Sequence, residues 1–340
     1  MKKLSFLDKI FFFLNSVAAA LLLTSYLIPY ISPKITSTVS VLSLGLPLLL
    51  ICNTLFMLYW MLKLKKQFLV SLIILLIGYQ HVNAFIQINE KKTLGDDDLK
   101  IMSYNVRMFN MYNWTKEKNI ETKIKNLIYK EDPDVVAIQE YHKNAKKFRN
   151  YPYQYIKNNH ASIELCILSK YKIINHGSLD FKPTGNNAIF ADIVIKSDTI
   201  RFYNLHLQSL KIDKNKDNFG AKDSKNLLQT LKKHFRIQAT QIEQLKAHEK
   251  KCNYRTIFMG DFNNTAFSWV YKTLKEKKTD TFIASGSGFG KTFDYIFPFR
   301  IDFILVDESM EVTSFKNFKE NYSDHFPIMS RINFSKNHKK

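Results

Sequence analysis

Polar side chains recur at the ends of apolar, strand-like runs between residues 99 and 333. Taken singly, each is most simply a hydrogen-bonded structural group, because a polar side chain beside a buried strand needs a partner. Six such positions within one stretch favour a shared functional site. They are Asn105, Glu140, His206, Asp261 with Asn263, Asp302, and Asp324 with His325.

These side-chain types fit the hydrolysis of a phosphate ester. That reaction needs a hard divalent cation, and oxygen ligands suit Mg²⁺ or Mn²⁺. Glu140, Asp324 and the amide oxygen of Asn105 are suitable ligands. The attacking water needs a base with a pKa near neutrality, which histidine supplies. We therefore expect His325 to act as the base and Asp302 to fix its tautomer.

Eight apolar runs are predicted to be the strands that position these residues. Helical spacing predicts a helix over 119–129 and a long amphipathic helix over about 224–250, with a break near Phe235 and Arg236. Many strands with few helices between them indicate an α+β fold of two stacked sheets flanked by helices, and argue against a doubly wound parallel sheet. The predicted strands are 99–107, 134–139, 165–168, 189–195, 200–206, 256–260, 300–306 and 328–332.

The composition changes sharply near residue 88. The chain has 340 residues with a formal net charge of +20, and the part after Gly95 mixes charged and apolar residues as a soluble domain does. Its basic balance fits either a lysine-rich surface or a partner rich in phosphate, such as nucleic acid or anionic head groups. Three cysteines are too few for a disulfide framework. We expect a membrane region over 1–90, a linker over 91–98 and a catalytic domain over 99–335.

Three apolar stretches, 10–31, 39–62 and 68–88, make up the first part of the chain. The first two are long enough to cross a bilayer as helices. The first also has features of a signal peptide, but a second long apolar stretch so soon afterwards favours an uncleaved anchor. The third carries Gln80, His81 and Asn83 in its second half, so it either spans or lies at the interface. We favour three spans.

Lysines flank these stretches unevenly and predict their orientation. Lys2, Lys3 and Lys9 precede the first stretch, a cluster at 63–66 follows the second, and only Lys34 lies between the two. The positive-inside rule then places the amino terminus and the 63–66 turn in the cytoplasm. With three spans the catalytic domain lies across the membrane, which is periplasmic for a bacterial inner-membrane protein. With two spans it is cytoplasmic.

Together these motifs resemble the endonuclease/exonuclease/phosphatase superfamily over about 99–333. The resemblance rests on six motifs in the expected order: Ser103-Tyr104-Asn105, Gln139-Glu140, His206, Gly260-Asp261-Phe262-Asn263, Arg300-Ile301-Asp302-Phe303-Ile304 and Ser323-Asp324-His325. It implies a four-layered α/β/β/α sandwich of two mixed sheets, preceded here by the transmembrane helical segment.

The resemblance also implies a role for each matched residue. Glu140, Asn105 and Asp324 would hold the metal directly or through water. His325 would activate the nucleophilic water, and Asp302 would orient His325. The remaining three would act on the substrate: Asp261 and Asn263 would position the water and a phosphate oxygen, and His206 would donate to the phosphate as charge builds.

Several functional alternatives stay open at this level. The substrate is a phosphate ester of nucleic acid, of a phospholipid or of a small molecule, and no obligate protein partner is inferred. The glutamate that orients the mid-domain histidine in deoxyribonuclease-like members has no clear counterpart, which weakens the DNA interpretation. Asn186 and Asn187 either contact substrate or only form a turn. A non-catalytic membrane scaffold that kept the fold is the alternative function, and a transporter has little support.

Overall fold

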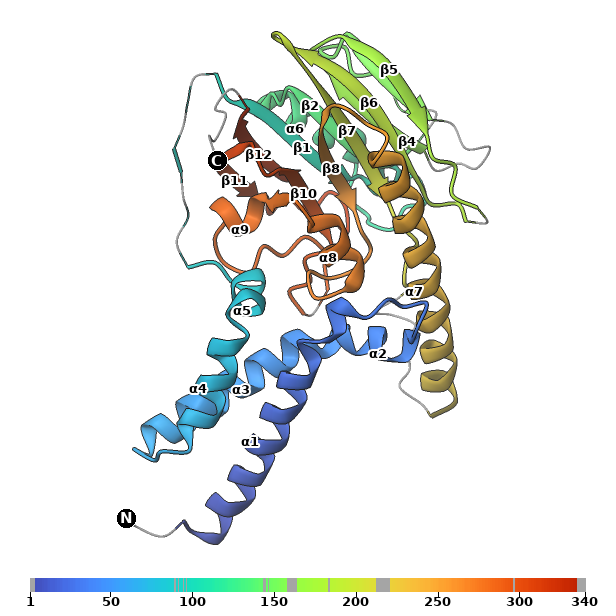
Figure 1. Cartoon of the computed structure of the whole chain (residues 1–340). Helices are drawn as coiled ribbons and strands as arrows, with labels where there is room; N and C mark the ends of the chain where they lie inside the picture. The colour runs from blue at the N-terminus through green and yellow to red at the C-terminus, as the bar shows by residue number, and fades with distance from the viewer. Residues whose placement is uncertain are drawn as a thin grey trace.

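The computed structural model describes residues 4–88, 90, 92–93, 95, 97–142, 145, 147–157, 164–182, 184–211, 221–295 and 297–334. Within these residues the chain forms a two-sheet sandwich with a bundle of apolar helices beneath it (Figure 1). Each sheet has six strands and mixes parallel with antiparallel pairing.

The first sheet has the strand order β11-β12-β1-β2-β4-β3. Its strands are β1 (Leu99–Asn105), β2 (Val135–Tyr141), β3 (Tyr153–Lys157), β4 (Glu164–Ser169), β11 (Glu311–Asn317) and β12 (Ile328–Asn333). The second sheet has the order β5-β6-β7-β8-β10-β9. Its strands are β5 (Ile173–Ser178), β6 (Asn187–Ile195), β7 (Asp198–His206), β8 (Arg255–Asp261), β9 (Lys278–Asp280) and β10 (Asp302–Asp307).

Alternation along the strands builds the four layers. On β1, Ile101 points into the core shared by the two sheets, whereas Met102 points outward against α6 (Ile120–Glu131). Period-two alternation gives each sheet two apolar faces, and the outer face must be covered by a helix. Helices α7 (Ala221–Glu249) and α8 (Trp269–Lys275) cover the second sheet, and the short α9 (Thr281–Ser285) packs beside β11. The predicted four-layered α/β/β/α sandwich is therefore confirmed.

Each sheet contains one parallel pair, and the two pairs set the position of the polar residues. β1 runs parallel to β2, and β7 runs parallel to β8. The pairs lie against each other across the sandwich, since β1 contacts β8 and β2 contacts β7. Parallel strands end at the same edge of a sheet. Four carboxyl-terminal strand ends therefore meet at one edge, and these ends carry Asn105, Glu140, His206 and Asp261.

The helical bundle contains two helices long and apolar enough to cross a membrane. They run over Phe6–Tyr30 and Ser37–Leu62, and a third candidate is a pair of helices bent by 81°. The elements are α1 (Phe6–Ser25), η1 (Ile28–Tyr30), α2 (Ser37–Val41), η2 (Leu42–Gly45), α3 (Leu46–Leu62), α4 (Phe68–Ile77) and α5 (Tyr79–Phe85). The buried Ser71 hydroxyl accepts from Asn15 and donates to Asn53, which links α4 to α1 and α3.

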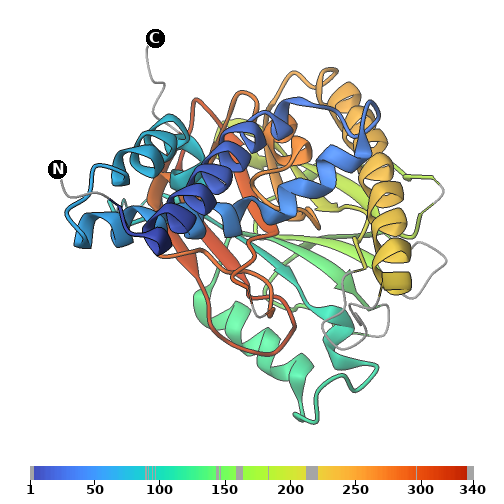
Figure 2. The ribbon, with the colours of Figure 1, turned by 90° about the horizontal axis from the view of Figure 1, so that it is seen from below.

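The connection between the two long helices lies against the sandwich. α2 packs beside α7, as the view from below also shows (Figure 2), and η1 packs beside α8. Lys34 pairs with Glu243 of α7, and the Lys272 ammonium lies 4.2 Å from the centroid of the Tyr30 ring. At the opposite end of the bundle Lys63 pairs with Asp8, and this end lies far from the sheets (Figure 1).

All eight predicted strands are present, and four further strands occur that the sequence did not predict. The missed strands are β3, β5, β9 and β11. The long helix α7 is continuous, so the predicted break near Phe235 is wrong, because Phe235 packs its buried side chain against Leu210 and Leu231 without interrupting the helix. The predicted linker is partly attached within its described residues: the Thr93 N–H donates to the Thr313 carbonyl, and the Thr313 hydroxyl to Asp98.

Candidate active site

A bulge near the end of β2 turns Glu140 toward the site. The register between β2 and β4 shifts between Ile138 and Tyr141, and Glu140 has a left-handed φ of 50°. A bulge leaves an extra residue unpaired and redirects its side chain. The Glu140 carboxylate lies 3.2 Å from the amide nitrogen of Asn105. Burial, and after it the charge of Asp324, raises the pKa of Glu140.

Asn204 connects the two sheets directly behind this bulge. Its amide nitrogen donates to the carbonyls of Ile138 and Cys166, both at 2.8 Å. Its amide oxygen accepts from the Gln139 side chain at 2.7 Å. The side chain is fully buried, so these bonds satisfy groups that water cannot reach. Asn204 therefore supports the strand end that carries Glu140.

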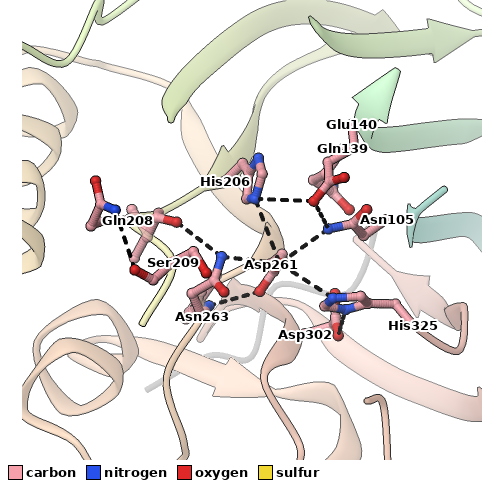
Figure 3. Close-up of polar contacts among 12 residues, drawn as sticks. Asn105, Gln139, Glu140, His206, Gln208, Ser209, Asp261, Asn263, Asp302 and His325 are labelled. Carbon is pink, nitrogen blue, oxygen red and sulfur yellow. Dashed lines mark hydrogen bonds and ion pairs between the residues drawn. The ribbon is translucent and has the colours of Figure 1, made fainter. Parts of the chain in front are cut away.

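Asp261 lies at the centre of the polar network (Figure 3). Its carboxylate accepts from the Asn105 amide at 3.1 Å and from the Asn263 backbone N–H at 2.7 Å. Asn263 also donates its amide to the Leu207 carbonyl at 2.9 Å, which fixes the turn after β8. Burial raises the pKa of Asp261.

The glycine before Asp261 is required by the close approach of β7. Gly260 has a φ of +140°, and a Cβ placed on it would lie 2.1 Å from the Leu205 carbonyl oxygen. Only glycine adopts such a conformation without strain. It brings β8 against β7 so that Asp261 pairs in register with both His206 and Asp302.

His325 and Asp302 form a buried hydrogen-bonded pair. The imidazole Nδ1 lies 2.8 Å from the Asp302 carboxylate, which leaves Nε2 facing Asp261 at 3.7 Å (Figure 3). Burial lowers the pKa of His325, but the charges of Asp302 and Asp261 outweigh it and hold this pKa well above the usual value. The predicted contact between His325 and Asp302 is therefore present.

His206 also faces Asp261, together with Glu140. Its Nε2 lies 3.7 Å from Glu140 and 3.8 Å from Asp261. Both distances are too long for hydrogen bonds. Burial lowers the pKa of His206 to about 4, so the ring is neutral at pH 7 and forms no ion pair. The site therefore contains a neutral and a basic imidazole on either side of one carboxylate.

Arg107 is a site residue that the sequence interpretation missed. Its guanidinium lies 2.9 Å from the Asp324 carboxylate and 4.8 Å from the centroid of the Trp114 ring. Residues 107–110 all have positive φ, between 42° and 64°. Such backbone costs on the order of 1 kcal/mol per residue and persists where surrounding structure holds it. The only sequence signal was its position, two residues after Asn105.

Part of this network borders one cavity of about 320 Å³. Its lining contains a polar set and an apolar, largely aromatic set of residues, which we call the polar side and the apolar side. The polar side includes the titratable and amide groups Glu140, His206, Asp261, Asn263, Asp324 and His325, and also Ser209, Lys211, Asn264 and Thr265. The apolar side consists of Leu44, Leu210, Phe293, Tyr295, Phe299 and Ile301. Asn186 also lines the cavity, whereas Asn187 begins β6 and donates to Ser178.

The donor groups fit a divalent cation. Four carboxylates converge here, against the cationic Arg107 and the basic His325, and hard cations prefer such oxygen ligands. The ligand atoms of Asp261, Asp302 and His325 lie within 4.8 Å of one another. One oxygen of Asp302 is buried without a hydrogen-bond partner in the described structure. This group differs from the predicted ligands Glu140, Asn105 and Asp324, which lie beside it.

Residues 102–325 match the family model described as Endonuclease/Exonuclease/phosphatase family. Residues 8–85 match a model described as a domain of unknown function, DUF8431. No curated protein matches this chain.

Solved structures show the same fold at low sequence identity. The D. rerio TDP2 complexed with single strand DNA product has a TM-score of 0.53 and 18% identity, covering 70% of this chain and 100% of that one. The human Nocturnin catalytic domain with bound sulfate has a TM-score of 0.53 and 15% identity, covering 74% and 98%. A Bacteroides thetaiotaomicron endonuclease/exonuclease/phosphatase family protein has a TM-score of 0.51 and 18% identity, covering 74% and 100%.

The family match spans well over half of the chain and includes all six strand-end positions. The structural matches agree with it at the level of the two-sheet fold. The chain therefore belongs to the endonuclease/exonuclease/phosphatase family, whose members are typically metal-dependent phosphoesterases.

Proposed function

We propose that this protein is a membrane-anchored phosphoesterase that depends on Mg²⁺ or Mn²⁺ and uses a water activated by His325. The observation that carries the proposal is the convergence of Glu140 and His325 on one cavity, although 185 residues separate them in the chain. The ends of β2, β7 and β8 and the turn before β12 bring polar residues to this cavity, and Asn105 and Asp302 hydrogen-bond to two of them. A merely structural role for each residue would not require this.

The chain's own residues would each perform one task. Asp302 holds Nδ1 of His325, so Nε2 is free to accept a proton from a water in the cavity. Asp261 and Asn263 orient that water and a phosphate oxygen. His206, neutral at pH 7, retains an N–H that can donate to the phosphate as negative charge develops.

The cation would be held by Glu140, Asp324 and the oxygen of Asn105, and would supply charge neutralisation at the phosphate. We favour these ligands over the group of Asp261, Asp302 and His325, because a cation there would engage the His325–Asp302 pair to which we assign the activation of water. The Asn105 amide now points its nitrogen at Glu140, so a half-turn of the amide would present its oxygen. Neutralising the carboxylates would also bring the pKa of His325 back toward neutrality.

We further propose that residues 1–90 cross the membrane three times, with 91–98 as the connection to the catalytic domain at 99–335. The turn between α3 and α4 lies at the end of the bundle far from the sheets (Figure 1), and the α4–α5 pair returns the chain to the domain. With lysine-rich ends in the cytoplasm, the domain faces the other side, which is the periplasm for a bacterial inner-membrane protein. An alkaline phosphatase fusion after Lys92 should be active, and an active cytoplasmic fluorescent fusion there would contradict this.

The hydrolytic proposal is tested with the purified full chain in detergent. Labelled DNA, RNA and phospholipid, together with bis(p-nitrophenyl) phosphate, are incubated with Mg²⁺, with Mn²⁺ and with EDTA. We expect cation-dependent release of product from at least one substrate, lost with EDTA and restored by excess Mg²⁺.

The alternative function is a non-catalytic membrane scaffold that retained the fold. It predicts no cation-dependent hydrolysis of any of these substrates by a folded protein. Equal hydrolysis by the wild type and by Asn105→Ala or Glu140→Ala variants would also reject the assigned metal ligands.

A further inference from the structure

The membrane segment contributes one residue, Leu44, to the apolar side of the active-site cavity. Leu44 lines the cavity and belongs to the candidate span Ser37–Leu62. It lies in η2, two residues before α3 begins. A substrate in the catalytic cavity therefore contacts an element of the chain that the hydropathy places in, or at the surface of, a bilayer.

Packing fixes Leu44 in this position. Together with Val41 it packs against Leu210, Leu231 and Phe235 of the catalytic part of the chain. Leu210 is itself a lining residue. The wall is therefore a joint product of the membrane region and the sandwich.

The aromatic half of the same wall is attached to the third apolar segment. Phe293, Tyr295 and Phe299 lie on the loop before β10. Phe85 of α5 contacts this loop, with ring-centroid distances of 5.1 Å to Phe289 and 6.3 Å to Phe297.

Arg300, at the end of this loop, makes a further contact between the loop and α5. Its guanidinium donates to the Ala84 carbonyl of α5 at 3.2 Å and pairs with Asp280 at 2.8 Å. The arginine is buried, so it ties the end of the membrane segment to the start of the strand that carries Asp302. Both parts of the apolar wall are thus held by elements from the first 90 residues.

We propose that the substrate is a phosphate ester carrying a lipid chain, which enters from the bilayer with its chain along the apolar side and its phosphate on the polar side. This inference rests on the proposed phosphoesterase activity. A nucleic acid strand would place successive phosphates beside this wall, and strand-binding grooves neutralise them with rows of cations. Among the described residues that line the cavity, Lys211 is the only lysine or arginine. One phosphate with an apolar substituent fits this lining better.

The test compares lipids with a tail-free ester under identical conditions. The full chain in dodecyl maltoside micelles with Mg²⁺ receives, one at a time, phosphatidylcholine, phosphatidylethanolamine, phosphatidylglycerol, sphingomyelin and phosphatidic acid. Bis(p-nitrophenyl) phosphate and a single-stranded DNA oligonucleotide serve as substrates without a lipid chain. We expect at least one lipid to show a kcat/KM more than tenfold above both.

Leu44→Ser then tests the wall itself. We expect the ratio of kcat/KM for the preferred lipid to that for bis(p-nitrophenyl) phosphate to fall about tenfold, since an apolar contact in a pocket discriminates by about this factor. Leu42→Ser is the matched control: Leu42 lies in the same short helix, is 60% exposed and does not line the cavity. It should leave the ratio unchanged.

The outcomes separate this inference from the proposed function. Cation-dependent hydrolysis that favours the oligonucleotide, or that treats lipid and tail-free ester alike, keeps the phosphoesterase and overturns the lipid substrate. An unchanged ratio in Leu44→Ser also overturns it, provided that the variant's thermal unfolding matches that of the wild type. Absence of hydrolysis of every ester overturns both proposals. If Leu44→Ser fails to fold, Leu44→Ala replaces it with the same expected direction.

Discussion

The two sides of the active-site cavity are built in different ways. Much of the polar side lies on strand ends, where backbone pairing fixes the positions, as in the register of His206 with Asp261. The apolar side comes from loops and from η2, and side-chain packing alone joins Leu44 to Leu210.

This difference suggests a division of labour. Hydrogen-bonded strand ends hold side chains to within the small tolerance that proton transfer and phosphate positioning need. Packed apolar walls tolerate substitution and discriminate mainly by contact area. We therefore expect changes on the polar side to lower turnover or stability strongly, and changes on the apolar side to alter substrate preference mildly.

The largest effect is expected from the base. His325→Gln removes the proton acceptor while keeping a polar side chain, and should lower kcat about 10²- to 10⁴-fold, as loss of general base catalysis typically does. Steady-state rates with the best substrate give the measurement. Asp302→Asn should lower kcat by less, because the imidazole remains. A His325→Gln variant with wild-type kcat would remove the assigned base.

The second-largest effect, on stability, is expected from replacing Gly260, the residue before Asp261. Gly260→Ala forces a positive φ on alanine and a clash with the Leu205 carbonyl. Strain of about 1–3 kcal/mol and overpacking of about 1–3 kcal/mol should together lower the free energy of unfolding by roughly 2–6 kcal/mol. Thermal or denaturant unfolding of the full chain measures it. Gly185→Ala is the control, because a Cβ there meets no atom within 4 Å, and it should be near neutral.

Loss of the Asn204 hydrogen bonds between the two sheets should lower the free energy of unfolding somewhat less. Asn204→Leu leaves the carbonyls of Ile138 and Cys166 and the Gln139 amide without this partner. A buried group left unpaired costs about 1–3 kcal/mol, so destabilisation of roughly 2–5 kcal/mol is expected. The exposed Asn226 of α7 provides the control variant Asn226→Leu. Equal unfolding midpoints for the two variants would show that Asn204 does not stabilise the sandwich.

The smallest effect is expected from a substitution on the apolar side of the cavity. Tyr295→Leu keeps an apolar contact but shortens it, so KM for the preferred substrate should rise about two- to fivefold, which is about 1 kcal/mol or less, with kcat nearly unchanged. Tyr254→Leu, at an exposed position away from the cavity, should change neither constant. A large loss of kcat in Tyr295→Leu would mean that the apolar side also takes part in the chemistry.

The sequence could predict the interior of both sheets and the polar strand ends, because a strand with neighbours on both sides carries a strong apolar signal. All eight predicted strands are interior strands, and the four missed ones, β3, β5, β9 and β11, are the sheet edges. An edge strand pairs on one side only and is more exposed, as β5 shows, so its composition resembles that of a loop. The polar residues stood out because they lie at the beginnings or ends of the interior strands.

Two residues at or beside the site, Leu44 and Arg107, could not be predicted from the local sequence. Leu44 is one leucine among many in an apolar stretch, and only the packing of η2 on Leu210 places it at the cavity. Arg107 reaches Asp324 through a left-handed turn that residue types do not predict. Local sequence determined which strands form and which polar groups end them, because burial and alternation act over a few residues. The tertiary structure alone decided what faces those groups, because that depends on contacts between segments far apart in the chain.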